Sequence, residues 1–288
     1  MAQQIEYTEE QIKKASYPEP KNVLIYSEIP IKRLDTPLGR VYYHINAEPK
    51  DRVYIYSSTT ILSNTLAKGK AFDMWLGNSN SYKDAMDYAH ERAFVGSMSH
   101  ALIMFLIWGK TVDTDNGFYD QDSGKIVPVP DEVKLRLQGF LDFYYEYKPK
   151  PLATEIALYD HTRDENGDLL YPWAGTADQI MHIDGKLWLV DIKTGKEHPK
   201  DHALQLTSYK MLWDHLYGDQ HGKIDVLACL YITKTGKYKL KKYKFVPLDW
   251  CHVYSNFEYI VKDGFGRMPK IKEKEELPTI YKIKGELK

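Results

Sequence analysis

The residues with the clearest chemical potential lie near the end of the apolar segment LWLVDIKTGK, residues 187–196, where Asp191 and Lys193 stand two positions apart. Side chains two apart in a β-strand project from the same face, about 6–7 Å apart along the strand. Asp178 belongs to the preceding expected strand of the same hairpin, and pairing of the two strands brings its carboxylate close to that of Asp191. An apolar strand is therefore expected to end in a cluster of ionisable groups.

This cluster has the composition of a divalent metal site. Neighbouring carboxylates repel each other, and a partly buried pair is costly to keep ionised. Mg²⁺ or Mn²⁺, which prefer oxygen ligands, relieves that repulsion. Lys193 beside such an ion is suited to orienting water or to stabilising charge that develops on a phosphate. The alternative is an ordinary ion pair at a strand end, since a D-x-K triplet is expected about once by chance in a chain of this length.

The segments around the cluster predict a helix, three strands, a helix and a strand. Their expected ranges are 130–147 for the first helix, 153–160, 176–183 and 187–195 for the strands, 202–218 for the second helix and 226–233 for the last strand. Pro130 marks the start of the first helix and Gly218 the end of the second. Asp184-Gly185 predicts a tight hairpin turn, because both residue types tolerate positive φ. We expect one more strand in YKLKKYKFVPL and a final helix in WCHVYSNFEYIVKDGFG.

The N-terminal half predicts elements that elaborate this core. A short charged helix is expected at 8–15, two strands at 40–45 and 52–58, and a helix, loop and helix that end near Gly77. A long helix at 81–109 and a loop at 114–124 follow. The expected fold class is therefore α/β.

Three further motifs accompany the aspartates and the lysine. QLTSY places Gln205 and Tyr209 four positions apart, on one face of the second helix. GSMSH places Gly96 four positions before His100, and ATEIALY puts Glu155 on the first strand. His90 and Glu91, earlier on the long helix, are competing candidates for the metal ligand. His90 precedes His100 by ten residues, nearly three full helical turns, so the two histidines lie on similar faces of the helix.

This set of motifs, in this order, resembles the PD-(D/E)xK nuclease superfamily, and specifically its RecB-like exonuclease branch. The resemblance implies a restriction-endonuclease-like core and a DNA exonuclease that depends on one or two Mg²⁺ or Mn²⁺ ions. The implied catalytic residues are Asp178, Asp191, Lys193, Gln205 and Tyr209, and the implied metal ligands are His100, Glu155, Asp178, Asp191 and the carbonyl of Ile192.

The resemblance spans about residues 52–245. SSTTILS, with Trp75-Leu76-Gly77, is similar to the N-terminal segment of phage nucleases and of mitochondrial genome maintenance exonucleases. It implies an N-terminal extension at 1–51, a nuclease domain at 52–270 and a C-terminal tail at 271–288.

The chain departs from the family pattern in two respects, which bear on its expected ligands and on its subgroup within the family. An acidic residue often follows the histidine in this branch, whereas 101–105 is apolar here. Cys229 and Cys251 are the two cysteines of the chain, too few for an iron–sulfur cluster, so the iron–sulfur subgroups are not expected.

Composition limits the setting in which the protein works. The net charge of −1 gives no bulk attraction to nucleic acid or to a membrane, so DNA binding needs a local patch. The polar start, the absence of about 18 consecutive apolar residues and two cysteines that we expect to be buried thiols favour a reduced, cytoplasmic compartment without membrane contact. We expect DNA as partner, single-stranded or with single-stranded ends, with a single-strand-binding or recombination protein as a possible second partner.

Several alternatives stay open. The basic runs KTGKEHPK (193–200) and KLKKYK (239–244) either track a phosphate backbone or protect a sheet edge. Trp75, Tyr82 and Trp173 either stack on bases or pack in the core. The competing functions are a recombination accessory protein with a degenerate site and a structure-specific endonuclease of the same fold. A role in recombination or replication, in a phage, rests on analogy.

Overall fold

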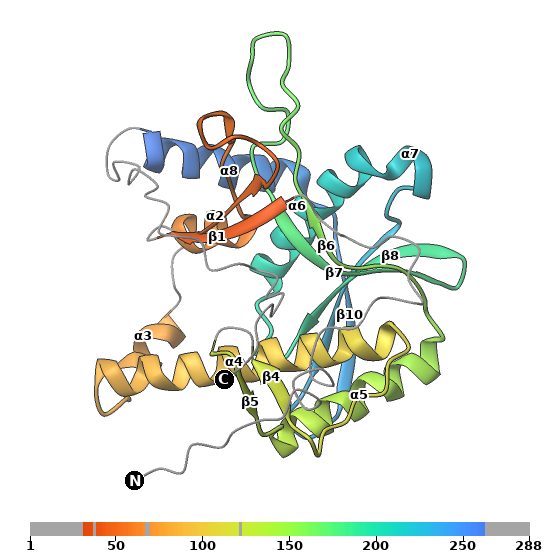
Figure 1. Ribbon diagram of the computed structural model, residues 1–288. Helices are drawn as coiled ribbons and strands as arrows, with labels where there is room; N and C mark the ends of the chain where they lie inside the picture. The colour runs from red at the N-terminus through yellow and green to blue at the C-terminus, as the bar shows by residue number, and fades with distance from the viewer. Residues whose placement is uncertain (1–30, 37–38, 67–69, 121–122, 263–288) are drawn as a thin grey trace, which may run out of the picture.

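The computed structural model describes residues 31–36, 39–66, 70–120 and 123–262, so the helix expected at 8–15 lies outside the described residues. The described chain is a mixed α/β structure around a five-stranded sheet, as Figure 1 shows, which confirms the expected class. The strands, in the spatial order β10-β9-β8-β7-β6, are β6 (Lys150–Leu158), β7 (Gly175–Ile183), β8 (Lys186–Lys193), β9 (Val226–Ile232) and β10 (Tyr238–Tyr243).

The connections of this sheet follow the expected order of elements. Helix α5 (Asp131–Tyr147) precedes β6, β7 and β8, which pair antiparallel in sequence order. Helix α6 (Pro199–Leu216) then crosses over to β9, which runs parallel to β8. The β7–β8 turn has φ of 50° at Asp184 and 73° at Gly185, as the sequence predicted.

Two hydrophobic cores cover the two faces of the sheet (Figure 1). Helices α4 (Tyr82–Ile107) and α5 pack on one face through residues such as Met98 and Phe140. Helix α6 packs on the other face with α2 (Ser58–Thr65) and α8 (Pro247–Lys262), where Trp213 is fully buried. The near-continuous apolar runs of β8 and β9 follow from this burial on both sides.

The N-terminal strands form a second, small sheet that lies against the first. It comprises β1 (Ile31–Thr36), β2 (Gly39–His44) and β3 (Ile55–Tyr56) in the order β1-β2-β3. The Tyr42 hydroxyl hydrogen-bonds the Thr176 hydroxyl at 3.0 Å, and Ser208 Oγ donates to Ser58 Oγ at 2.7 Å. These contacts tie the small sheet and α2 to the start of β7 and to α6.

Several sequence-based expectations were wrong in detail. The strand expected at 52–58 is limited to β3, because Ser57 caps α2 by accepting a hydrogen bond from the Thr60 amide. β1 was missed. The loop expected at 114–124 contains β4 (Phe118–Asp120), which pairs with β5 (Lys125–Val127). Gly218 begins the short helix α7 (Gly218–His221) instead of closing α6.

Four smaller features complete the description of the fold: helix α3, a 3-10 turn, the two cysteines and the search for membrane-spanning helices. Helix α3 (Lys70–Gly77) ends at the expected glycine, and a 3-10 turn, η1 (Pro49–Asp51), joins β2 to β3. Cys251 is exposed, which corrects the expectation that both cysteines are buried; Cys229 is buried. Among the described residues, no helix combines the length and the apolar character needed to cross a membrane.

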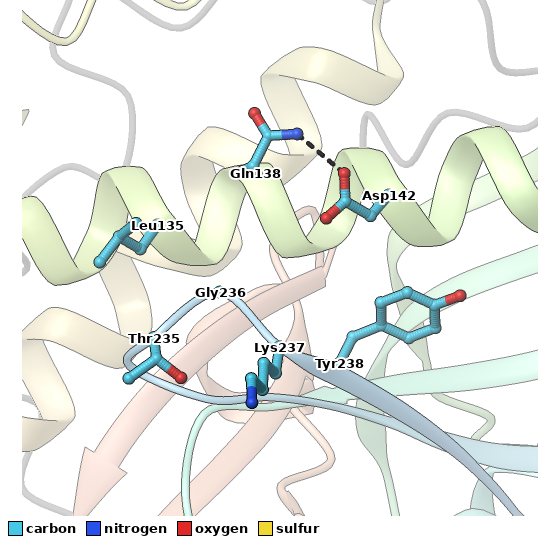
Figure 2. A pocket seen from close by; sticks show the side chains of 7 residues that line it. All are labelled: Leu135, Gln138, Asp142, Thr235, Gly236, Lys237 and Tyr238. Carbon is cyan, nitrogen blue, oxygen red and sulfur yellow. Dashed lines mark hydrogen bonds between the residues drawn. The ribbon is translucent and has the colours of Figure 1, made fainter.

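Helix α5 crosses the β9–β10 turn at very short range. A Cβ atom on Gly139 would lie 2.3 Å from the carbonyl oxygen of Gly236 and 2.9 Å from Cγ2 of Ile232. Figure 2 shows the turn beneath the helix, beside a surface pocket of about 480 Å³ that no predicted site residue lines. Glycine at 139 therefore sets the distance between α5 and the sheet.

We predict that Gly139→Ala lowers the free energy of unfolding by about 1–3 kcal/mol, because the added methyl group must displace backbone. Chemical denaturation measures the change. Gly77→Ala is the matched control in another helix, where a Cβ meets nothing within 4 Å, and it should leave stability unchanged or slightly raised. Equal stability of Gly139→Ala and the wild type would show that the helix does not depend on this contact.

Candidate metal and catalytic site

Three predicted ligands meet at one end of the large sheet. His100 on α4, Glu155 on β6 and Asp178 on β7 each offer one ligand atom, and these atoms lie within 4.8 Å of one another. Nδ1 of His100 is 3.4 Å from Oδ2 of Asp178 and 3.9 Å from Oε1 of Glu155. This triad has the donor set and the spacing to hold a metal ion.

Asp178 lies where the pairing of β7 with β8 ends. The last paired residues are Gln179 and Val190. Beyond them, the carboxylate of Asp178 takes the place of a backbone partner and accepts a hydrogen bond from the Ile192 amide at 2.7 Å. Ile192 thus contacts Asp178 through the Ile192 backbone amide. The same hydrogen bond fixes the side chain of Asp178 to the strand that carries Asp191 and Lys193.

Glu155 reaches the site through an unusual backbone conformation. Its φ is +47° inside β6, and it lies between Thr154 and Ile156, which pair with Gln179 and Ala177. That register sets Glu155 opposite Asp178. For a residue with a Cβ, the left-handed conformation costs about 1–2 kcal/mol, and such strain is common at functional sites.

His100 is brought to the sheet by the glycine one turn earlier. A Cβ on Gly96 would lie 3.2 Å from Oγ1 of Thr194, the residue after Lys193. Glycine thus allows α4 to pass close to the end of β8, and this explains the G-x-x-x-H spacing physically. The competing candidates His90 and Glu91 are exposed on α4 and lie outside the triad.

A second group of side chains surrounds Lys193. Its ammonium nitrogen lies 2.5 Å from Oδ2 of Asp191 and donates a hydrogen bond to Oε1 of Gln205 at 3.0 Å. The amide of Gln205 in turn donates to the Tyr209 hydroxyl at 3.0 Å. Asp191 is thus paired with the lysine and is not a member of the triad. All the predicted side chains are gathered in one region, in two adjoining groups.

Two groups that sequence analysis missed support this arrangement. A Cβ on Gly175 would lie 2.3 Å from Cε1 of Tyr209, so only glycine leaves room for that ring. Cys229 is the β9 partner of Asp191, and its sulfur lies 3.9 Å from Oδ2 of that aspartate. The pairing register that brings Cys229 here is not readable from its apolar surroundings in the sequence.

Arg136 supports the end of β8 from the opposite side. It is buried on α5, pairs with Glu132 at 3.1 Å and approaches the Thr194 carbonyl oxygen at 3.5 Å. Arg92 on α4 shares the same glutamate. This cluster therefore joins α4, α5 and the residue that follows Lys193.

The charges of the site shift its pKa values strongly. Burial opposes protonation of His100, but Asp178, Glu155 and Asp191 outweigh it and raise the pKa of the imidazole to about 9. Burial, together with Asp191 and Glu155, raises the pKa of Asp178 against the opposing effect of His100 and Lys193. Burial lowers the pKa of Lys193, but Asp191 and Asp178 outweigh it and raise the value.

Aromatic residues expected to stack on bases differ in their surroundings. Trp173 is buried in the core, donates from its indole nitrogen to the Ser208 carbonyl oxygen and packs on Trp250, so its role is structural. Tyr82 is exposed at the start of α4, and Trp75 on α3 is half-buried. The latter two keep the stacking role as a prediction.

Comparisons with known proteins add little to this geometry. No family model matches the chain, and no curated protein matches it. Among solved structures, "Crystal structure of SSO0001" aligns with a TM-score of 0.30 and 18% identity, covering 60% of this chain and 71% of that chain. That similarity is too low to support a functional argument.

We predict that divalent-metal affinity rises with pH. At neutral pH His100 holds a proton, because its pKa is raised to about 9, and Nδ1 must lose that proton to bind metal. The logarithm of the Mn²⁺ association constant should rise by up to about one per pH unit between pH 7 and 9, above the pKa of about 7 to which burial raises Asp178, as measured by calorimetry. His100→Gln should bind more weakly with a smaller slope; an unchanged slope would remove His100 from the ligand set.

We also predict opposite effects of Glu155→Gly on binding and stability. Glycine removes the ligand and relieves the positive-φ strain, so Mn²⁺ affinity falls while the metal-free protein gains stability relative to Glu155→Ala by about 1 kcal/mol. Both variants lack the carboxylate, and their difference in unfolding free energy therefore reports the backbone alone. Equal stability of the two would mean that position 155 is not strained.

Proposed function

We propose that the protein is a metal-dependent DNA nuclease of the PD-(D/E)xK type, and more specifically an exonuclease of the RecB-like branch. The observation that carries the proposal is the convergence of His100, Glu155 and Asp178 beside a lysine, Lys193, that Asp191 and Gln205 hold. The order α5, β6, β7, β8, α6, β9, with β8 parallel to β9, supports a restriction-endonuclease-like core. The exonuclease assignment rests on the resemblance of the motifs.

The proposed metal is Mg²⁺ or Mn²⁺. Two of the three triad donors are carboxylate oxygens, which these ions prefer, and an imidazole nitrogen is compatible with Mn²⁺. A bound ion of this kind neutralises phosphate charge and lowers the pKa of water, which is what phosphodiester hydrolysis requires at neutral pH. The triad accounts for one ion, and Asp191 with the carbonyl of Ile192 remain proposed ligands.

The side chains around the ion have separable roles in this proposal. Lys193 presents a positive charge to the phosphate, where it stabilises the charge that develops during attack. Gln205 fixes the position of the ammonium group, and Tyr209 fixes Gln205 through a 3.0 Å hydrogen bond. Burial raises the pKa of Tyr209 well above its usual range, so the hydroxyl stays protonated and acts in orientation.

The nuclease proposal predicts metal-dependent shortening of end-labelled linear DNA that Lys193→Ala slows by about 100-fold or more, the scale for loss of one charge-stabilising group. The assay compares single- and double-stranded substrates with Mg²⁺, Mn²⁺ and EDTA. Lys186→Ala, at the exposed opposite end of the same strand, is the matched control and should keep full activity. Asp178→Asn should lose activity together with metal binding.

The outcomes separate the competing functions. Cleavage of a circular single strand, which has no ends, would favour a structure-specific endonuclease over an exonuclease. Intact substrates that are nevertheless retained by the wild type would favour a DNA-binding accessory protein with a degenerate site. Equal activity of Lys193→Ala and Lys186→Ala would contradict the proposed role of the site.

A further inference from the structure

Strand β10 presents its lysines to two different faces of the sheet. Lys239 and Lys241 alternate with Leu240 and Lys242 along the strand. Lys242 lies over the ring of Trp188 at 4.7 Å, and Leu240 packs in the core beneath α4 and α5. Because alternate residues share a face, Lys239 and Lys241 project from the opposite face, which α6 covers in part.

That face is the one that carries the candidate catalytic pair. In the strand register, Lys193 pairs with Tyr231 and Tyr231 with Lys239. Asp191 is likewise in line with Cys229 and Lys241. Lys239 and Lys241 are thus each two strands away from a residue of the Asp191–Lys193 pair, roughly 10 Å at the usual strand spacing.

A glutamate from the loop after Lys193 holds both lysines. Oε1 of Glu197 accepts from Lys239 at 2.6 Å and Oε2 accepts from Lys241 at 2.8 Å. Lys241 also lies over the ring of Tyr243, 5.5 Å from its centroid. Two cations share one carboxylate, so these three side chains together carry one excess positive charge. Lys239 is 62% exposed, Lys241 is 32% exposed and Glu197 is 33% exposed.

Protection of a sheet edge explains this group only in part. β10 is an edge strand, and lysines on an edge discourage pairing with other chains. Such protection works from either face, however, and does not require two ammonium groups to converge on one acceptor. A phosphodiester also offers two free anionic oxygens, and lysine binds phosphate as a point charge, so a phosphodiester can take the place of the carboxylate between these two ammonium groups.

We propose that Lys239 and Lys241 form a docking site for the phosphodiester backbone of the nucleic-acid strand engaged at the candidate active site, with Glu197 occupying the position of a phosphate until the strand displaces it. The inference rests on the proposed function and adds a substrate-contacting surface to it. A separation of roughly 10 Å is longer than the distance between adjacent phosphates of one strand, so the lysines contact a phosphate beyond the reacting one. The lysines therefore anchor the strand and do not act on the scissile bond.

The test measures binding of a fluorescently labelled 20-nucleotide oligo-dT by anisotropy in EDTA, over a range of salt concentrations. Lys239→Ala/Lys241→Ala should bind about 10-fold more weakly near 0.1 M salt, and the slope of log K against log salt should fall in magnitude by about 0.7, the value for one lost phosphate contact. Glu197→Gln should bind about 3-fold more tightly, since it frees both lysines. Lys242→Ala, from the opposite face of the same strand, should match the wild type.

Wild-type binding with no difference between the double variant and Lys242→Ala would overturn the inference, as would a wild type that does not retain the oligonucleotide at all. Cleavage assays with Mg²⁺ on the same proteins separate this outcome from failure of the nuclease proposal. If the protein cleaves DNA but Lys239→Ala/Lys241→Ala binds the oligonucleotide as tightly as the wild type does, only the docking-site proposal is rejected. Binding that depends on the two lysines without any cleavage removes the nuclease assignment alone.

Discussion

Mutual repulsion among closely spaced carboxylates is the constraint on which the rest of the site depends. Glu155, Asp178 and Asp191 come from three adjacent strands, and burial together with the other two carboxylates raises the pKa of Asp178. Lys193 and the raised pKa of His100 offset part of this repulsion, and the pKa of Asp178 is still raised. A divalent cation is the partner that such a cluster favours, because it replaces the proton on His100 and satisfies the carboxylates together.

The fold holds these charges together through a few close approaches of backbone. Pairing of β7 with β8 stops at Gln179, and this frees Asp178 to bond the Ile192 amide. Gly96 lets α4 pass over Thr194, and Gly175 leaves room for the ring of Tyr209. A larger side chain at Gly96 would displace α4 from Thr194, and one at Gly175 would displace the ring of Tyr209. The positions of the site residues therefore depend on how closely the backbone packs.

The sequence predicted the elements of the core because their signals are local. Alternating and continuous apolar runs, the Asp184-Gly185 turn and the four-residue spacings of α4 and α6 all act within one element or one hairpin. The convergence of His100, Glu155 and Asp178 was expected from family resemblance, and the distances now place their ligand atoms within 4.8 Å. The metal, the substrate and the reaction remain proposals.

What the sequence did not predict depends on contacts between distant segments. Strand β1 pairs with β2, and it carries little apolar alternation of its own. The partnership of Asp191 with Cys229, and of Lys193 with Tyr231, follows from the register of two parallel strands separated by a whole helix. The left-handed backbone at Glu155 is likewise invisible in the sequence, because glutamate gives no signal for positive φ.

The most direct test of the central claim, a metal ion held by the triad, is anomalous diffraction from crystals of the protein grown or soaked with Mn²⁺. We predict an anomalous peak about 2.0–2.3 Å from Nδ1 of His100 and from carboxylate oxygens of Glu155 and Asp178. Crystals whose strongest peak lies elsewhere, with the triad empty at saturating Mn²⁺, would contradict it.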